Sequence, residues 1–368
     1  LFFSEKLVFL LAPGFSAEAH EIGVTLTRIL LPTILFTFIS TIQSQQLRGD
    51  NIFAPPACLA IPLNLLLILT FVFLTPLFGI KGAAYAFALG TIIQVLMLHP
   101  YIRKTGYRFR FHFDLKNKGL REILILTLPI MLGNAIQSID TLINRILASG
   151  LAEGSMAALN FSNKLALFIV GLVSLGAGTV CYTKMSELGA RREFNERKSF
   201  LKSIINLLNL IVVPATVGMM VLNVPIIKFV FEYGAFDSNS SEMTATALWF
   251  YSIGIVGFVL RDIITRAFYA IGDATTPMIN GAIAVAISIA GNLILVRFMG
   301  IGGLALATSI SGIAGTLLLI VSLRKKIGQF GFKEVAGTLL KICFAGAIMG
   351  MTVNSLYPIL YNSTGILA

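Results

Sequence analysis

Long apolar segments separated by short polar loops constrain the fold of this chain more than any other feature. About 20 helical residues match the hydrocarbon thickness of a bilayer, and lipid accepts only helices or closed barrels. Strands are excluded because the segments are too long and show no alternation of apolar and polar residues. Ten membrane-spanning helices are therefore expected, at residues 22–42, 56–78, 82–101, 122–147, 154–181, 203–222, 244–264, 277–296, 301–323 and 335–356.

Composition supports an all-α polytopic membrane protein. Apolar residues make up 56% of the chain and charged residues 12%, and the mean hydropathy is +0.87. A soluble domain would contain about 25% charged residues. The three cysteines, Cys58, Cys181 and Cys343, lie in apolar segments without metal-ligand spacing, which favours a packing role. The sequence contains no Ser-His-Asp, HExxH, Walker or GxGxxG arrangement that would indicate catalysis.

The net charge of +11 reflects membrane topology rather than nucleic-acid binding. Basic residues crowd into alternate loops, which the positive-inside rule places in the cytoplasm. The opposite loops hold only Lys81, Lys228 and Arg297. The cytoplasmic set comprises Arg48, Arg103, Lys104, Arg108, Arg110, Lys116, Lys118, Arg121, Lys184, Arg191, Arg192, Arg197, Lys198, Lys202, Arg266, Arg324, Lys325, Lys326 and Lys333.

An internal repeat with a period of 221 residues divides the chain. The motif Pro13-Gly14-Phe15 recurs as Gly234-Ala235-Phe236, and residues 79–86 recur as 300–307. Six spans separate the copies, and because six is even, the two bundles should have the same orientation in the membrane. Residues 14–101 are therefore expected to superpose on 235–323 by a rotation about the membrane normal.

The repeat also predicts the domain organisation. Residues 1–101 form the remainder of a first bundle, 102–121 a basic cytoplasmic linker, 122–323 a second bundle, and 324–368 an additional C-terminal transmembrane region. The counterpart of the second bundle's first helix would begin about 100 residues before Leu1. The first two or three helices of the first bundle are therefore expected to be missing from this sequence.

Lys164 is the most unusual residue of the predicted spans. It lies about ten residues into segment 154–181, roughly 15 Å deep at 1.5 Å per residue. An ammonium at that depth costs about 2.5–3.5 kcal/mol unless it meets a partner or water. Asn160 and Asn163 share its face, so the preferred interpretation is a substrate site in a wet cavity that receives an anion. The alternative is a polar helix–helix contact. Arg28, near the outer surface, either snorkels or lines an outer vestibule.

Further polar residues inside the spans suggest a cavity wall and a cation site. One stripe on segment 122–147 should face protein or water; it comprises Asn134, Gln137, Thr141 and Asn144, with Asp140 beside it. A candidate oxygen-rich cation site comprises Asn144, Ser288, Asn292 and Thr308. Ordinary interhelical hydrogen bonds are the alternative for these four residues. Asp262 and Arg266 are spaced for a structural ion pair.

Several motifs together make the chain resemble the MurJ/MviN-type lipid II flippases of the MOP exporter superfamily. They are Ala12-Pro13-Gly14-Phe15; Leu26-Thr27-Arg28-Ile29 with Pro32; Ile146-Leu147-Ala148-Ser149-Gly150 running to Ser162-Asn163-Lys164-Leu165; Glu232-Tyr233-Gly234-Ala235-Phe236; Arg266-Ala267-Phe268-Tyr269-Ala270 with Thr276-Pro277; and Gly302-Gly303-Leu304-Ala305-Leu306-Ala307-Thr308-Ser309. The resemblance covers nearly the whole chain. It implies fourteen helices in an N-lobe and a C-lobe around a V-shaped cationic cavity.

The resemblance also implies a function. Such proteins move the undecaprenyl-diphosphate-linked peptidoglycan precursor from the inner to the outer leaflet of the bacterial cytoplasmic membrane. The expected partners are this anionic lipid and membrane lipids, with no nucleic acid, no cofactor and a monomeric state. Coupling to Na⁺, H⁺ or the membrane potential is left open.

Two departures from the family pattern concern the candidate sites. The family usually has arginine where this chain has Lys164, so the charge is kept but bidentate binding of a diphosphate is lost. The resemblance places its other cavity arginines in the first two helices, which are expected to be missing from this sequence. Some relatives carry an acid at the position of Asn144, which bears on the cation site.

Other functions are weighed against this one. A superfamily exporter of another lipid-linked oligosaccharide, or of small molecules, is the nearest alternative; exporters of cationic drugs would need acids in the cavity, and Asp140 is the deep candidate. A membrane-embedded glycosyltransferase or phosphatase would need an ordered extramembrane loop with carboxylates or histidines. A purely structural or receptor role leaves Lys164 unexplained.

A labelling experiment tests the polar stripe of segment 122–147. Single cysteines introduced at Asn134, Gln137, Thr141 and Asn144 should react with water-soluble thiol reagents, because unpaired amides facing hydrocarbon are costly. Protection of all four positions, together with labelling by lipid-soluble reagents, would show that the stripe faces lipid.

Overall fold

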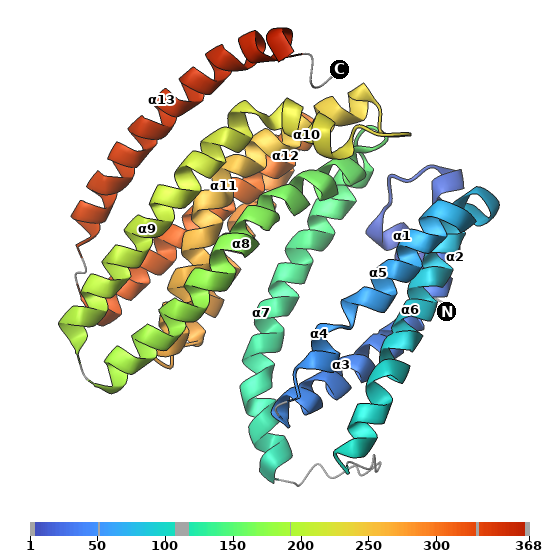
Figure 1. The fold of residues 1–368 in the computed structure, drawn as a ribbon, viewed down its shortest axis with the longest axis horizontal. Helices are drawn as coiled ribbons and strands as arrows, with labels where there is room; N and C mark the ends of the chain where they lie inside the picture. Colours follow the sequence, from blue (N-terminus) through green and yellow to red (C-terminus); the bar gives the residue numbers. More distant parts are fainter. Residues whose placement is uncertain (1–3, 51, 107–117, 192, 329–330, 365–368) are drawn as a thin grey trace. The chain divides into compact units, whose positions relative to one another are not determined.

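The computed structural model describes residues 4–50, 52–106, 118–191, 193–328 and 331–364, and all regular secondary structure in these residues is helical (Figure 1). The chain divides into two units, residues 1–117 and 118–368. The boundary between them falls within the predicted linker 102–121.

The first unit contains six α-helices and a π-helical segment among its described residues. The helices are α1 (Ser4–Leu11), α2 (Ala17–Leu30), α3 (Thr33–Gly49), α4 (Ala54–Ala57), α5 (Ala60–Leu69), the π-helical η1 (Thr70–Leu74) and α6 (Thr75–Lys104). Helix α6 packs against α3 and α5, and Leu47, Leu98 and Ile102 form a small buried cluster. Pro32 separates α2 from α3, as expected of a residue that lacks a backbone N–H.

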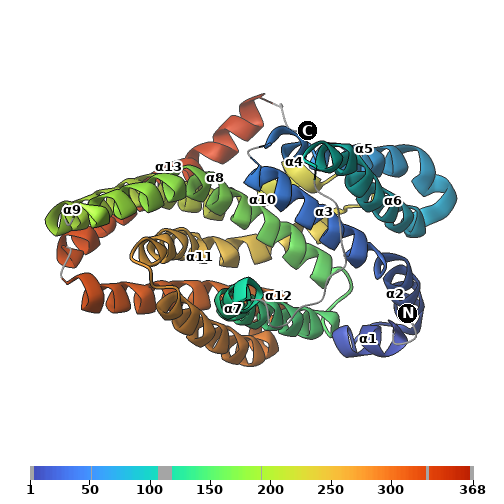
Figure 2. The same cartoon turned by 90° about the horizontal axis from the view of Figure 1, so that it is seen from below.

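The second unit is built around α11. Its helices are α7 (Lys118–Ser149), α8 (Ser155–Ala190), α9 (Phe194–Val221), α10 (Asn223–Phe231), α11 (Ser238–Ala270), α12 (Thr275–Ile327) and α13 (Phe332–Thr364). Helix α11 packs against α8, α9 and α12 (Figure 2). Leu248, Ile255, Ile263 and Phe268 on α11 are fully buried, so this helix supplies much of the core.

Hydroxyl groups tie the neighbouring helices to the backbone of α11. Ser162 of α8 donates to the carbonyl of Thr244 at 2.7 Å. From α12, Thr316 donates to the Gly257 carbonyl at 2.6 Å. Gly257 leaves little space, since a Cβ there would lie 3.1 Å from the backbone nitrogen of Ile313. Small residues and hydroxyls are the usual interface of membrane helices, because lipid supplies no hydrophobic drive between them.

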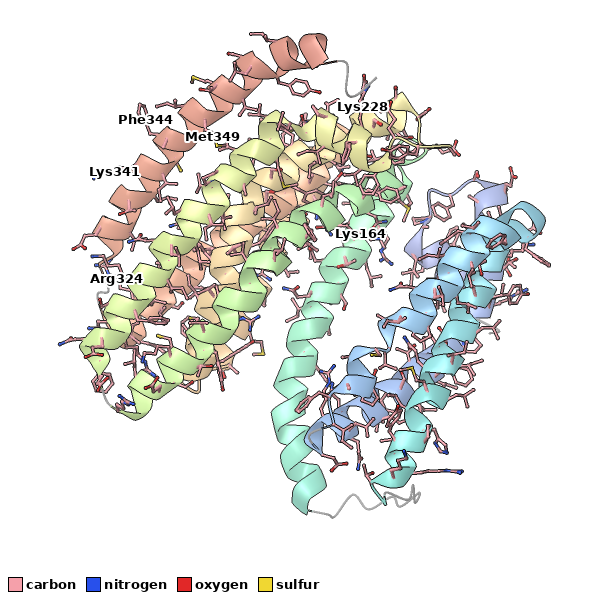
Figure 3. The ribbon with its side chains drawn as sticks, viewed as in Figure 1. Lys164, Lys228, Arg324, Lys341, Phe344 and Met349 are labelled. Carbon is pink, nitrogen blue, oxygen red and sulfur yellow. The ribbon has the colours of Figure 1, made fainter. Side chains whose placement is uncertain are left out.

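Every predicted span overlaps helical residues of the structure, and all except 122–147, which lies in α7, overlap a helix identified as able to cross a membrane. Eight helices of the described residues are long and apolar enough to cross a membrane. Helix α12 is 53 residues long and contains a non-helical bend at Gly300, which separates the expected spans 277–296 and 301–323. Large apolar side chains such as Phe298 and Phe344 are exposed, and Figure 3 shows Phe344 on α13. Such exposure is typical of a surface that faces lipid.

The 221-residue repeat is present in local backbone structure. Gly79 has φ 55° and Gly300 has φ 53°, and both bend what would otherwise be continuous helices. Helix α2 begins at Ala17 and α11 at Ser238, which is 221 residues later. Their N-caps correspond too: the Ser16 side chain accepts from the Ala19 N–H, and the Asp237 side chain accepts from the Ser240 N–H. Superposition of the two bundles stays a prediction, but their bends and helix starts coincide at the expected spacing.

The predicted role of the cysteines needs one correction. Cys181 is buried and Cys58 half-buried, in keeping with a packing role, but Cys343 is exposed. The packing interpretation is therefore wrong for Cys343. Cys343 lies on α13, which contacts the rest of the unit mainly through α9. The apolar residues around Cys343 in the sequence therefore indicate a surface that faces lipid, not a protein core.

Gly300 offers a test of the bend. We expect Gly300→Ala to lower the free energy of unfolding by about 1–3 kcal/mol, because L-residues are strained at positive φ. Gly281→Ala is the matched control: it lies in the same helix α12, and a Cβ there meets nothing within 4 Å, so alanine's higher helix propensity should leave stability unchanged or raised. Thermal unfolding in detergent measures both; equal stabilities of the two variants would contradict the strain argument.

Candidate substrate and cation sites

Lys164 presents a cation on the surface of its unit. It lies in the N-terminal third of α8 and is exposed; its place on the helix is labelled in Figure 3. Among the described residues, no carboxylate forms an ion pair with it. Its Nζ lies 6.0 Å from the ring centroid of Phe161, one turn earlier. The ammonium is therefore available to an anion within this unit.

The predicted companions of Lys164 line a polar cavity. Asn160 and Asn163 border a cavity of about 120 Å³, together with groups from α7, α11 and α12. The other polar lining residues are Asp140, Thr141, Asn144, Arg145, Tyr251 and Thr308. The structure thus brings the amides of α8 together with Thr141 and Asn144 of the α7 stripe, with Asp140 beside them, and with Thr308 of the candidate cation site. Lys164 itself does not line this cavity.

The remaining members of the α7 stripe are placed differently. Gln137 is exposed and borders a second cavity, of about 210 Å³, beside Arg261 and Thr265 of α11. Thr141 donates its hydroxyl to the Gln137 carbonyl at 3.2 Å. The side chain of Asn134 lies outside the described residues.

Buried oxygen atoms gather where α7 meets α12. Ser288 and Asn292 are 1% and 0% exposed, and the Asn292 amide donates to Ser288 Oγ at 3.5 Å. The Ser288 hydroxyl hydrogen-bonds the Asp140 side chain. Thr308 donates to the Leu304 carbonyl at 3.0 Å and hydrogen-bonds Tyr251. Ser288 thus links Asp140 to Asn292, while Thr308 and Tyr251 line the same cavity as Asp140 and Asn144. In this oxygen network Asp140 is central rather than peripheral.

Three oxygens of this network lack a partner in the described part of the chain. They are Asp140 Oδ1, Asn144 Oδ1 and Asn292 Oδ1, all buried. Buried polar atoms normally have partners, so each such atom calls for an explanation. Carboxylate, amide and hydroxyl oxygens suit a hard cation. The donor set fits a small monovalent or divalent cation.

Arg261 and Tyr251 are site residues that the sequence did not single out. Arg261 is half-buried on α11 and forms no direct ion pair with the described acids; Asp140 and Asp262 supply the negative charge around it. Tyr251 is buried and lines the first cavity together with Thr308. The sequence signal for Arg261 was a charged residue within an apolar span. The nearby Asp262 and Arg266, which are spaced for an ion pair with each other, made this signal hard to recognise.

The structure also describes two other residues or pairs named from the sequence, the Asp262–Arg266 ion pair and Arg28. The ion pair of Asp262 with Arg266 is confirmed, with Oδ2 and Nε 3.0 Å apart. Arg28 donates from Nε to Ser4 Oγ at 3.0 Å, which joins α2 to α1 within the first unit. A role for Arg28 in an outer vestibule stays a prediction.

Comparison with known proteins identifies close relatives. A family model described as lipid II flippase MurJ matches residues 1–365. The "Probable lipid II flippase MurJ" of Buchnera aphidicola subsp. Baizongia pistaciae is 28% identical over 353 residues, covering 95% of this chain and 69% of the relative. The "Lipid II flippase MurJ" of Burkholderia cenocepacia is 27% identical over 328 residues, covering 87% of this chain and 64% of the relative. This chain thus spans about two thirds of the length of these relatives.

Solved structures give the same picture. The structure titled "Lipid II flippase MurJ, inward closed conformation" matches with a TM-score of 0.81 at 28% identity, over 96% of this chain and 72% of that one. An inward-facing multidrug resistance MATE family transporter of the MOP superfamily matches with a TM-score of 0.74 at 18% identity, over 89% of this chain and 77% of that one. The second likeness shows a shared fold alone.

The oxygen network predicts a stabilising effect of sodium. At a Na⁺ concentration ten times the Kd, binding should add about 1.4 kcal/mol to the free energy of unfolding, relative to N-methylglucamine chloride of equal ionic strength. Asn292→Ala should reduce this gain. Asn280→Ala is the matched control, since Asn280 is a buried amide of the same helix that bonds Ser322 outside the network. Equal sodium effects in both variants, or none in the unaltered chain, would rule out this site.

Proposed function

Because the chain belongs to the lipid II flippase MurJ family, we propose that it moves lipid II from the inner to the outer leaflet of the bacterial inner membrane by alternating access. The family model covers nearly the whole chain, and the eight apolar helices make it a multi-pass membrane protein. The cargo is the undecaprenyl-diphosphate-linked peptidoglycan precursor, an anionic lipid with a large polar head.

The observation that carries this proposal is the exposed ammonium of Lys164 within an apolar span. A diphosphate cannot cross hydrocarbon unless fixed positive charge replaces its hydration. A cation that pairs with no described carboxylate can supply that charge. A single lysine binds as a point charge, without the fork of arginine, which favours binding weak enough for release.

Export of another substrate is the second candidate. The MATE neighbours share the fold, and a cationic small molecule would require an accessible acid. Asp140 is the acid nearest to the cavities, but it is half-buried, hydrogen-bonded to Ser288 and near the charge of Arg261. The exposed charge within the apolar span of α8 is the positive charge of Lys164. It favours an anionic cargo, such as a lipid-linked oligosaccharide, over a cationic drug.

In this proposal the chain is a transporter and not an enzyme, and it uses no bound cofactor. It acts as a monomer, in contact with membrane lipids and without nucleic acid. Energy is supplied by the membrane potential or by Na⁺ or H⁺. The oxygen network around Asp140 and Asn292 supports an ion-coupled step.

Substitutions at Lys164 test the function in cells depleted of their lipid II flippase. Lys164→Ala should abolish growth rescue and Lys164→Gln should fail at normal expression, because both lose the charge. Lys164→Arg should retain rescue, because charge and reach persist. Membrane levels of each variant, measured by immunoblot, serve as the control. Normal rescue by a well-expressed Lys164→Ala protein would show that the lysine is not needed for transport.

A further inference from the structure

An aromatic cluster lies beneath Lys164. Phe161 of α8 packs against Phe231, the last residue of α10, with ring centroids 4.7 Å apart. It packs edge-on against Phe236 at 5.6 Å, and Phe231 and Phe236 are 6.0 Å apart. Phe161 is half-buried, so its ring is held by neighbours while Lys164 Nζ lies 6.0 Å from its centroid.

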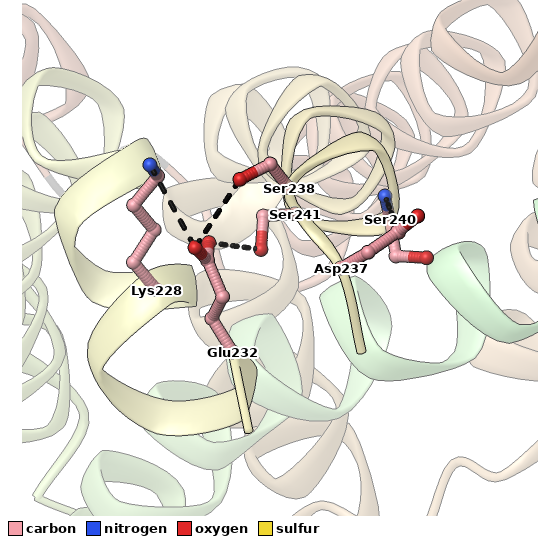
Figure 4. Close-up of polar contacts among 6 residues, drawn as sticks. All are labelled: Lys228, Glu232, Asp237, Ser238, Ser240 and Ser241. Atoms are coloured by element: carbon pink, nitrogen blue, oxygen red, sulfur yellow. Dashed lines mark hydrogen bonds and ion pairs between the residues drawn. The ribbon is translucent and has the colours of Figure 1, made fainter. Parts of the chain in front are cut away.

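The turn that carries Phe231 and Phe236 is itself fixed by polar contacts, drawn in Figure 4. The carboxylate of Glu232 accepts from Ser241 Oγ at 2.6 Å and from Ser238 Oγ at 3.3 Å. Lys228 Nζ lies 3.9 Å from the same carboxylate. Asp237 caps α11 by accepting from the Ser240 N–H at 2.8 Å.

Backbone geometry completes the turn. Gly234 has φ 64°, a conformation that glycine adopts without strain. The motif Glu232-Tyr233-Gly234-Ala235-Phe236, to which the transport mechanism assigns no role, therefore places Phe236 against Phe161, and Phe231, the residue just before the motif, supplies the second ring. The rigid turn at one end of the bundle is linked in this way to the cation on α8.

The Phe161 ring, 6.0 Å from Lys164 Nζ, restricts the orientations that the ammonium adopts. A cation within about 6 Å of an aromatic centroid is attracted by the ring's quadrupole. Lysine and phenylalanine three residues apart on a helix lie on the same face. An unrestrained lysine has many rotamers, and binding must freeze them; a side chain that is already restricted loses less entropy.

We propose that Phe161 is a positioning residue for the diphosphate site: its ring, fixed by Phe231 and Phe236, holds the Lys164 ammonium in the orientation that meets the anionic head of the substrate. The inference rests on the proposed function, because it assumes that Lys164 contacts a diphosphate. Phe161 acts through Lys164 and does not touch the substrate itself.

Equilibrium binding to the purified protein tests this inference, with undecaprenyl diphosphate in detergent as the probe. Phe161→Leu, which keeps an apolar side chain but removes the ring, should weaken binding about two- to fivefold. Phe161→Tyr, which keeps the ring, should restore binding to within about twofold of the unaltered chain. Phe344→Leu is the control, since Phe344 is an exposed phenylalanine of α13, a helix that packs mainly on α9 and not on α8, and it should bind like the unaltered chain.

A double-mutant cycle separates positioning from packing. If Phe161 acts only through Lys164, Phe161→Leu should cause no further loss in the Lys164→Gln background. Undecaprenol, which lacks the diphosphate, should bind all these variants equally. An equal loss in both backgrounds, or weaker binding of undecaprenol as well, would overturn the inference. Should Phe161→Leu fail to fold, Phe161→Met replaces it in the same cycle.

The same data distinguish this inference from the proposed function. If the unaltered chain binds undecaprenyl diphosphate and Lys164→Gln weakens that binding, but Phe161→Leu does not, only the positioning role fails. If the unaltered chain does not discriminate undecaprenyl diphosphate from undecaprenol, the proposed function fails first.

Discussion

The absence of water in the bilayer core is the constraint on which the rest of this structure depends. Every backbone N–H and C=O in hydrocarbon must find a partner within the chain, so the apolar segments become helices. Their few interruptions lie where the chain itself removes or redirects a hydrogen bond, at Pro32 and at the positive-φ glycines Gly79 and Gly300. The same constraint makes each polar side chain inside a span informative, because it needs a partner, a cavity or a ligand.

Helix α11 shows how close packing follows from that constraint. Without a hydrophobic drive between helices, contact depends on small residues and on hydroxyls that donate to neighbouring carbonyls. Ser162, Ser309 and Thr316 each donate to a carbonyl of α11 at 2.6–2.7 Å. The resulting rigid core holds α8 and α12 against one helix and lets side chains of α7, α8 and α12 converge on the polar cavity. The site is a consequence of this packing.

Two kinds of charge chemistry coexist in the second unit without neutralising each other. Lys164 lies exposed on α8, over an aromatic ring, while the oxygens of Asp140, Asn144 and Asn292 are buried where α7 meets α12. The cation suits an anionic lipid and the oxygens suit a small cation. Asn160, about one turn from Lys164, and Asn163, next to it in sequence, line the cavity that Asp140 and Asn144 also line. The same segment of α8 therefore carries Lys164, the residue proposed to bind substrate, and borders the cavity that Asp140 and Asn144 line.

The sequence by itself determined the spans, the 221-residue repeat and the unusual position of Lys164, because hydrophobic length, period and charge are properties of neighbouring residues. It also predicted the Asp262–Arg266 pair, whose partners are one helical turn apart. Only the tertiary structure decided that Cys343 is exposed, that Asp140 lies at the centre of the oxygen network, and that Arg261 borders one polar cavity and Tyr251 the other. It alone placed Phe161 against Phe231 and Phe236, about 70 residues away in sequence. The physical reason is that an amphipathic pattern shows which face of a helix is polar, whereas the neighbour that meets this face depends on how several helices pack at once.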